Sequence, residues 1–125
     1  MKLLLTRNDV NPNEPSNDGR TPLRAASYNG HEGVVELLLA QNDVNPNEPD
    51  KDGQTPLWRA SFHGHEGVVK LLLTRNNVNP DKPSNDGRTP LWTASFNGPE
   101  EVVKLLLTRN DVNPNEPSND GRTPL

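Results

Sequence analysis

Short apolar clusters separated by long polar stretches recur along this chain of 125 residues at a fixed interval. Three consecutive leucines occur every 34 residues, at positions 3–5, 37–39, 71–73 and 105–107. A second motif, Gly-x-Thr-Pro-Leu, keeps the same interval at positions 19–23, 53–57, 87–91 and 121–125. Residues 2–23 and 104–125 are identical, which indicates duplication within a tandem array. The interval predicts a repeat protein in which each unit is one supersecondary element.

Each unit begins with a segment that predicts a short helix. Thr21 can cap this helix with its side-chain oxygen, and Pro22 suits the first helical position because its missing N–H has no partner there. Asn29 and Gly30 both tolerate positive φ and predict the end of the helix. One face carries residues at helical spacing, of which the second and third are small: Leu23, Ala26 and Ser27. This face therefore predicts close contact with a neighbouring helix.

A second helix is predicted over residues 32–41. Its inner face is marked by Val34, Leu37 and Leu38, and its apolar stripe is widened by Val35 and Leu39. Asparagines stand where a left-handed residue is expected to end this helix in each unit, namely Asn42, Asn76 and Asn110. Residues 44–53 then hold two prolines and several Asn and Asp residues, which predicts a rigid, solvated turn.

Stacking of the units is required for either helix to persist. Isolated helices shorter than about 12–15 residues are marginal in water. Only 30% of the residues are hydrophobic, and composition alone would allow disorder. A solenoid, however, has a thin core and needs few apolar residues. The pattern therefore favours an all-α solenoid of stacked helix-turn-helix units over a disordered chain.

The repeated unit resembles the ankyrin repeat. The likeness rests on Gly-Arg-Thr-Pro-Leu-x-x-Ala-Ser followed by Asn-Gly-His-Glu-Gly-Val-Val-x-Leu-Leu-Leu, and it covers essentially the whole chain. A tetratricopeptide array shares the 34-residue period, but its Trp/Leu-Gly/Tyr signature is missing. The resemblance implies an ankyrin solenoid with projecting finger loops. We divide the single array into a partial repeat 1–16, full repeats 17–50, 51–84 and 85–118, and a partial repeat 119–125.

The chain departs from the ankyrin pattern at three places. The histidine that usually follows Thr-Pro-Leu is replaced by Arg24, Trp58 and Trp92. The Asn-Pro-Asn-Glu-Pro insert lengthens the finger loop, and Pro99 replaces the histidine found at positions 31 and 65. The first departure puts in question the hydrogen bonds that this histidine makes between repeats, and the second changes the length and tilt of the fingers.

Charge and composition exclude several classes of function. The net charge is -4 and no basic stripe is present, which argues against nucleic-acid binding. The absence of cysteine excludes disulfides and thiolate metal sites. The longest run of leucines has three residues, which is far too short for a membrane span or a signal peptide. We expect no membrane association and an intracellular, cytoplasmic location.

Catalytic and metal-binding constellations are not evident. His63 and His65 have a spacing that can hold a metal, but no nearby Cys or carboxylate set completes a site. Recurrent serines that pair with no His or Asp are better explained as small contact residues: Ser27, Ser61 and Ser95. Recurrent aspartates before glycine are explained as turn formers: Asp18, Asp52, Asp86 and Asp120. We expect no enzyme activity, no cofactor and no metal.

Aromatic residues provide the candidate binding surface. In successive first helices the i, i+4 pairs are Arg24 with Tyr28, Trp58 with Phe62, and Trp92 with Phe96. The tryptophans either pack between repeats or contact a partner. The resemblance implies that the second members of these pairs, with the residues that follow them, line a concave surface: Tyr28, Asn29, Phe62, His63, Phe96 and Asn97. It also implies partner contacts for the residues after the turn glycine, namely Arg20, Gln54, Arg88 and Arg122.

The function that this surface implies is protein binding without catalysis, with the concave groove of the solenoid as the scaffold. An aromatic row beside arginines has the composition of protein-binding hot spots. The alternative is a structural protein. Solenoids normally finish in polar capping repeats, and neither end here has one, so end-to-end self-association into a filament is the competing hypothesis.

Overall fold

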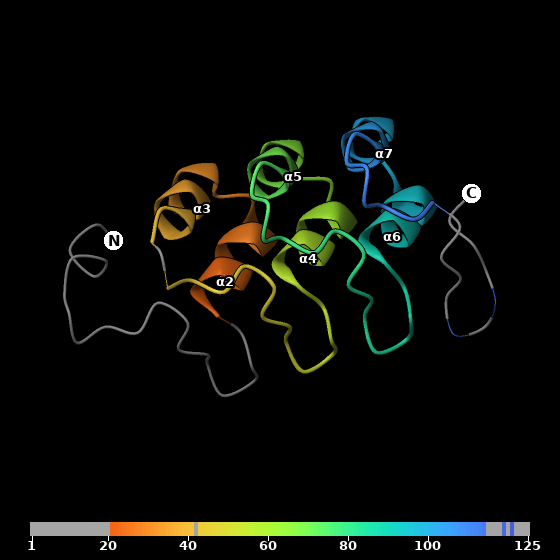
Figure 1. The fold of residues 1–125 in the computed structure, drawn as a ribbon, viewed down its shortest axis with the longest axis horizontal. Helices are drawn as coiled ribbons and strands as arrows, with labels where there is room; N and C mark the ends of the chain where they lie inside the picture. Colours follow the sequence, from red (N-terminus) through yellow and green to blue (C-terminus); the bar gives the residue numbers. More distant parts are fainter. Residues whose placement is uncertain (1–20, 42, 115–118, 120, 122–125) are drawn as a thin grey trace.

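Helices in the computed structural model form three consecutive pairs (Figure 1). The structure describes residues 21–41, 43–114, 119 and 121. Within these residues it contains six helices and no strand: α2 (Pro22–Asn29), α3 (Glu32–Leu39), α4 (Pro56–Phe62), α5 (Glu66–Leu73), α6 (Pro90–Asn97) and α7 (Glu100–Leu107). The even-numbered helices form one row and the odd-numbered helices a second row, while the long loops project together beyond the first row (Figure 1). The predicted all-α solenoid with projecting fingers is confirmed.

The inner helices α2, α4 and α6 begin at the predicted threonine caps. The side-chain oxygens of Thr21, Thr55 and Thr89 each accept the backbone N–H three residues on, at 3.2, 3.1 and 3.1 Å. Proline occupies the first turn of all three helices. At the end of α2, Gly30 has a φ of 74°, and it closes the helix as expected. Local chemistry alone therefore sets where these helices start.

The outer helices α3, α5 and α7 face the core differently from the prediction. In α3 the buried side chains are Val35, Leu38 and Leu39, while Leu37, predicted on the inner face, is 39% exposed. Val34 is only partly buried. In α5 the fully buried residues are Val68, Val69 and Leu72. The apolar stripe of α3 is therefore rotated by about one residue from the predicted face.

The predicted left-handed asparagine caps of the outer helices are wrong at both described positions. Among the described residues positive φ angles occur only at glycines, so Asn76 and Asn110 are not left-handed, and Asn42 lies outside the described residues. The right-handed residues Thr74 and Thr108 follow α5 and α7 instead. Each hydroxyl donates to the carbonyl three residues earlier, at 2.6 Å. These bonds satisfy free carbonyls at the helix ends without a left-handed residue.

The core lies between the two rows and continues from repeat to repeat. It includes leucines that are at most 1% exposed at one position of each inner helix, Leu23, Leu57 and Leu91. Ser27 and Ser61 are fully buried, as expected of small contact residues between helices, whereas Ser95 is only partly buried. The core is extended toward the fingers by Val44 and Val78, from the loops that follow α3 and α5. The segment predicted as a solvated turn is thus partly built into the core.

Hydrogen bonds join consecutive fingers within the described residues. The N–H of Asn85 donates to the Asp52 carbonyl at 2.9 Å, and the N–H of Asn119 donates to the Asp86 carbonyl at 3.0 Å. The side chain of Asn47 also bonds the backbone of the next repeat: its nitrogen donates to the Asn77 carbonyl, and its oxygen accepts the N–H of Asn79. The fingers therefore form a connected row. The proposed repeat limits stay a prediction, and the first partial repeat lies outside the described residues.

Candidate functional site

We use the name inner surface for the exposed side of the inner helices together with the loops that precede them. It carries an aromatic row, Tyr28, Phe62 and Phe96, one residue from each inner helix. Their exposed fractions are 38%, 38% and 72%. Because α2, α4 and α6 pack side by side (Figure 1), these residues recur at one level of the array. The structure therefore places the three predicted aromatic residues on one accessible surface.

The residues that follow the aromatic row are also brought to this surface. Asn29 and Asn97 are exposed. His63 is partly buried between two members of the row, with its ring centroid 4.3 Å from that of Tyr28 and 4.9 Å from that of Phe62. The neighbouring His65 places Nε2 2.8 Å from the Tyr28 carbonyl oxygen. Both histidines thus connect the first described repeat to the second.

Two predicted partner contacts, Trp58 and Trp92, are buried instead. Only 4% and 7% of their surfaces are exposed, so the rings pack inside the array and are not open to a partner. Trp58 stacks on Phe62 with a centroid separation of 5.3 Å, and its Nε1–H donates to the Arg88 carbonyl at 2.8 Å. Trp92 stacks on Phe96 at the same separation. The buried tryptophan rings thus support Phe62 and Phe96 of the aromatic row, and Trp58 supplies a hydrogen bond between repeats.

Two of the four predicted finger residues lie within the described part of the chain. Gln54 and Arg88 are half-buried. The Arg88 guanidinium carbon lies 4.5 Å from the centroid of the Trp92 ring, within cation–π distance. Arg20 and Arg122 lie outside the described residues. Of the predicted finger contacts, Arg88 is therefore the one that the structure links to the aromatic residues.

A buried ion cluster beside the aromatic row was not predicted from the sequence. It consists of Arg24, Asp50 and Arg59. The Arg24 Nε donates to Asp50 Oδ2 at 3.2 Å, and the Arg59 Nε lies 3.6 Å from the same oxygen. The other oxygen, Oδ1, accepts the N–H groups of Asp52 and Gln54. Two arginines therefore share one carboxylate whose hydrogen-bonding capacity is largely used.

The ion cluster could have been found by aligning the repeats with one another. Its members are the residues that break the repeat pattern at their positions. Where the chain has Arg24, the next two repeats have tryptophan; where it has Asp50, positions 16, 84 and 118 are serine. Arg59 stands where the other repeats have alanine and threonine. The three residues depart from the repeat pattern and lie together in the structure, which indicates that their identities depend on one another.

Charge and burial perturb two groups of the inner surface. Burial, reinforced by the positive charge of Arg24, lowers the pKa of Arg59 from its usual value. Burial, followed by the charge of Arg59, also lowers the pKa of His63 below 6.5. A neutral imidazole is thus favoured beside the arginine. The buried Nε2 of His63 and the buried Nε of Arg59 have no hydrogen-bond partner among the described residues.

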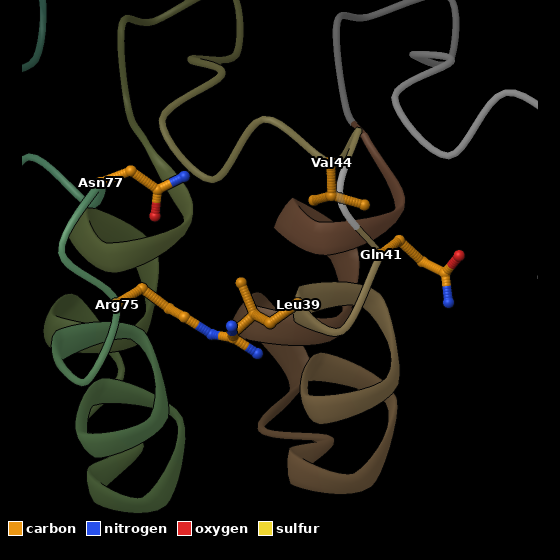
Figure 2. A pocket seen from close by; sticks show the side chains of 5 residues that line it. All are labelled: Leu39, Gln41, Val44, Arg75 and Asn77. Carbon is orange, nitrogen blue, oxygen red and sulfur yellow. The ribbon is translucent and has the colours of Figure 1, made fainter.

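A small cavity of about 140 Å³ lies between the ends of α3 and α5 (Figure 2). Its lining consists of Leu39, Gln41, Val44, Arg75 and Asn77. One repeat later, Arg109 occupies the matching position: it donates to the carbonyls of Leu73, Arg75 and Val78 and pairs with Asp111. Ligand pockets usually measure about 300–1,000 Å³. The cavity is therefore the counterpart, one repeat earlier, of the site that the Arg109 side chain fills, and Arg75 lines it (Figure 2).

Other kinds of site find little support in the described part of the chain. No group of three or more His, Cys, Asp or Glu side chains there could hold a metal ion. None of its helices has the length and apolar character needed to cross a membrane.

Comparison with known proteins bears on the whole chain. A family model described as ankyrin repeats (3 copies) matches residues 1–84 and 69–125. A comparison with curated proteins gave no match.

Proposed function

The chain belongs to the ankyrin-repeat family, and on this premise we propose that it is a scaffold that binds another protein through its inner surface. Ankyrin repeats are generally protein-interaction modules, and the family is generally non-catalytic. The proposal goes further by assigning the contact to the aromatic row and the residues next to it.

The observation that carries this proposal is the exposure of the aromatic row. Large apolar side chains that repeat on one surface are typical of interaction sites. Tyr28, Phe62 and Phe96 offer such side chains at one position of successive helices. Hot spots are enriched in aromatic residues and arginine, and Arg59 and Arg88 lie beside aromatic rings here.

Rigidity of the surface supports the same function. The buried tryptophans stack under Phe62 and Phe96, and hydrogen bonds join consecutive fingers. A surface that is already ordered loses little conformational entropy when a partner binds. Phe96 and its neighbours can therefore convert contact area into affinity with little reorganisation.

A selection experiment tests the proposal. A library of random peptides is displayed and selected on the intact chain, and binders are measured by fluorescence polarisation. The double variant Phe62→Ala/Phe96→Ala should weaken the selected binders about tenfold or more, since hot-spot truncations cost about 2 kcal/mol or more. The control is Leu37→Ala, which truncates a similarly exposed apolar residue on an outer helix.

The results separate binding from self-assembly. Binders that lose affinity in the double variant but keep it in Leu37→Ala support the proposal. Binders that are indifferent to the double variant contradict it. The competing filament hypothesis concerns chain ends that are largely outside the described residues, and it predicts a mass that grows with concentration in light scattering. A constant monomer mass would rule that hypothesis out.

A further inference from the structure

The ion cluster carries more positive than negative charge where it meets the inner surface. Arg24 and Arg59 approach one oxygen of Asp50, whose other oxygen already accepts two backbone N–H groups. The negative charge of Asp52, on the exposed finger, also stabilises the charged form of Arg59, but more weakly than Asp50 does. The two guanidinium groups are therefore incompletely neutralised by the chain itself.

Arg59 is the member of this cluster that reaches toward the inner surface. Both guanidinium carbons lie near the Tyr28 ring, that of Arg24 at 4.9 Å from its centroid and that of Arg59 at 5.6 Å, but 17% of the Arg59 side chain remains exposed against 5% for Arg24. His63, one turn further along α4, packs its ring against the same tyrosine at 4.3 Å. The Nε of Arg59 and the Nε2 of His63 both lack a hydrogen-bond partner in the described chain. Two nitrogens thus flank one exposed aromatic ring.

The inner row of helices carries a positive net charge, and the outer row a negative one. The three inner helices contain no Asp or Glu and hold two arginines. The three outer helices contain five glutamates and only two lysines. The inner row is therefore positive although the whole chain has a net charge of -4. This polarity favours the approach of an acidic side chain to the inner helices rather than to the outer helices.

We propose that the inner surface binds an acidic segment of another protein, with a carboxylate beside Arg59 and His63 and apolar side chains on Phe62 and Phe96. The carboxylate would pair with the part of the Arg59 side chain that remains exposed and would neutralise the excess charge of the ion cluster. Arginine is well suited to this role because its planar fork binds carboxylates in a fixed geometry. This inference rests on the proposed function and specifies the chemistry of the partner.

The peptide selection described above also tests this inference, with sequence composition as an added readout. Selected binders should be enriched in Asp and Glu relative to the unselected library. Arg59→Thr, which introduces the residue found at this position of α6, should weaken them about tenfold or more, as expected for a lost charge-assisted hydrogen bond. His63→Asn, which introduces the residue found in α2 and α6, should also weaken them. Circular dichroism confirms that both variants are folded.

Salt provides an independent measurement on the same binders. Their affinity should fall as salt is raised, because the screening length shortens from ~10 Å at 0.1 M to ~3 Å at 1 M. Binders that depend on Phe62 and Phe96 but show no acidic enrichment, and bind Arg59→Thr as well as the parent chain, would overturn the inference and leave the proposed function intact. A selection that yields no binders, or binders indifferent to both phenylalanines, would overturn both.

Discussion

Replacing Asp50 with serine should destabilise the array far more than an ordinary surface substitution. Serine is the residue at the matching position of the next repeat, so the backbone geometry is compatible with it. The change removes the carboxylate that lies between Arg24 and Arg59. It also removes the acceptor of the Asp52 and Gln54 N–H groups. Two neighbouring arginines then face each other, with only the weaker charge of Asp52 to compensate.

The magnitude follows from the burial of the cluster. The side chains of Arg24 and Asp50 are almost fully buried, so solvent cannot readily replace the lost partner. Breaking a buried ion pair by removing one member costs about 3–5 kcal/mol. Native domains have a total stability of only about 5–15 kcal/mol. The loss is therefore a large share of the whole.

Urea unfolding followed by circular dichroism measures this loss. With a slope of about 2 kcal/mol per molar urea, a loss of about 3 kcal/mol moves the midpoint by about 1.5 M. Arg59→Thr alone is the matched control. It leaves Arg24 paired with Asp50 and should change stability by less than about 1 kcal/mol, because it also removes a like charge.

A compensated variant tests the reasoning from the opposite direction. The triple change Arg24→Trp/Asp50→Ser/Arg59→Thr gives the first interface between described repeats the residues of the second interface at these three positions. The second interface uses an uncharged set at these positions: Trp58, Ser84 and Thr93. The triple variant should therefore recover most of the stability lost in Asp50→Ser. The reasoning is refuted if Asp50→Ser costs less than about 1 kcal/mol, or if the triple variant is no more stable than the single one.

Three further predictions concern the core, the cavity and pH. Leu72→Ala should cost about 2–5 kcal/mol in thermal unfolding because Leu72 is fully buried, whereas Phe96→Ala should stay within about 1 kcal/mol; equal losses would contradict the assignment of faces. Asn77→Asp should stabilise the chain by about 1 kcal/mol in urea unfolding by drawing Arg75 into the cavity, as Asp111 holds the arginine of the next repeat; no gain would reject this reading. Because its pKa in the folded chain lies below 6.5, His63 stabilises the fold above that pH and loses this contribution as the pH falls through the lowered pKa; His63→Asn should flatten this part of the stability–pH profile, and an unchanged profile would exclude His63 as its source.

The starts of the inner helices could be predicted from the sequence because local chemistry decides them. The Thr21 side chain caps α2, Pro22 suits its first turn, and Gly30 ends it. The face of the outer helices could not be fixed in this way. Five of their eight positions are apolar in α3, so neighbouring faces, about 100° apart, are similarly apolar. Packing against the adjacent helix, which buries Val35 and exposes Leu37, makes the choice.

The residues of the candidate site could likewise be predicted only where their role follows from a single position of the repeat. The aromatic row follows from the recurrence of large rings at one helical position, and the structure exposes them. Whether Trp58 is buried depends on its neighbour in the next repeat, which the sequence of one unit does not contain. The Arg24–Asp50 pair joins residues 26 apart, and only the stacking of repeats brings them together. Comparison between repeats, rather than within one, contains that information.

Site-specific photo-crosslinking tests the central claim most directly. A photoreactive phenylalanine analogue is placed at position 96 on the inner surface, or at position 37 on an outer helix, and each chain is irradiated with a selected binder. Both positions are exposed, with exposed fractions of 72% and 39%, so unspecific contact would label both of them. Binding through the inner surface predicts strong crosslinking from position 96 and little from position 37. Equal labelling at the two positions, or labelling mainly from position 37, would contradict the claim.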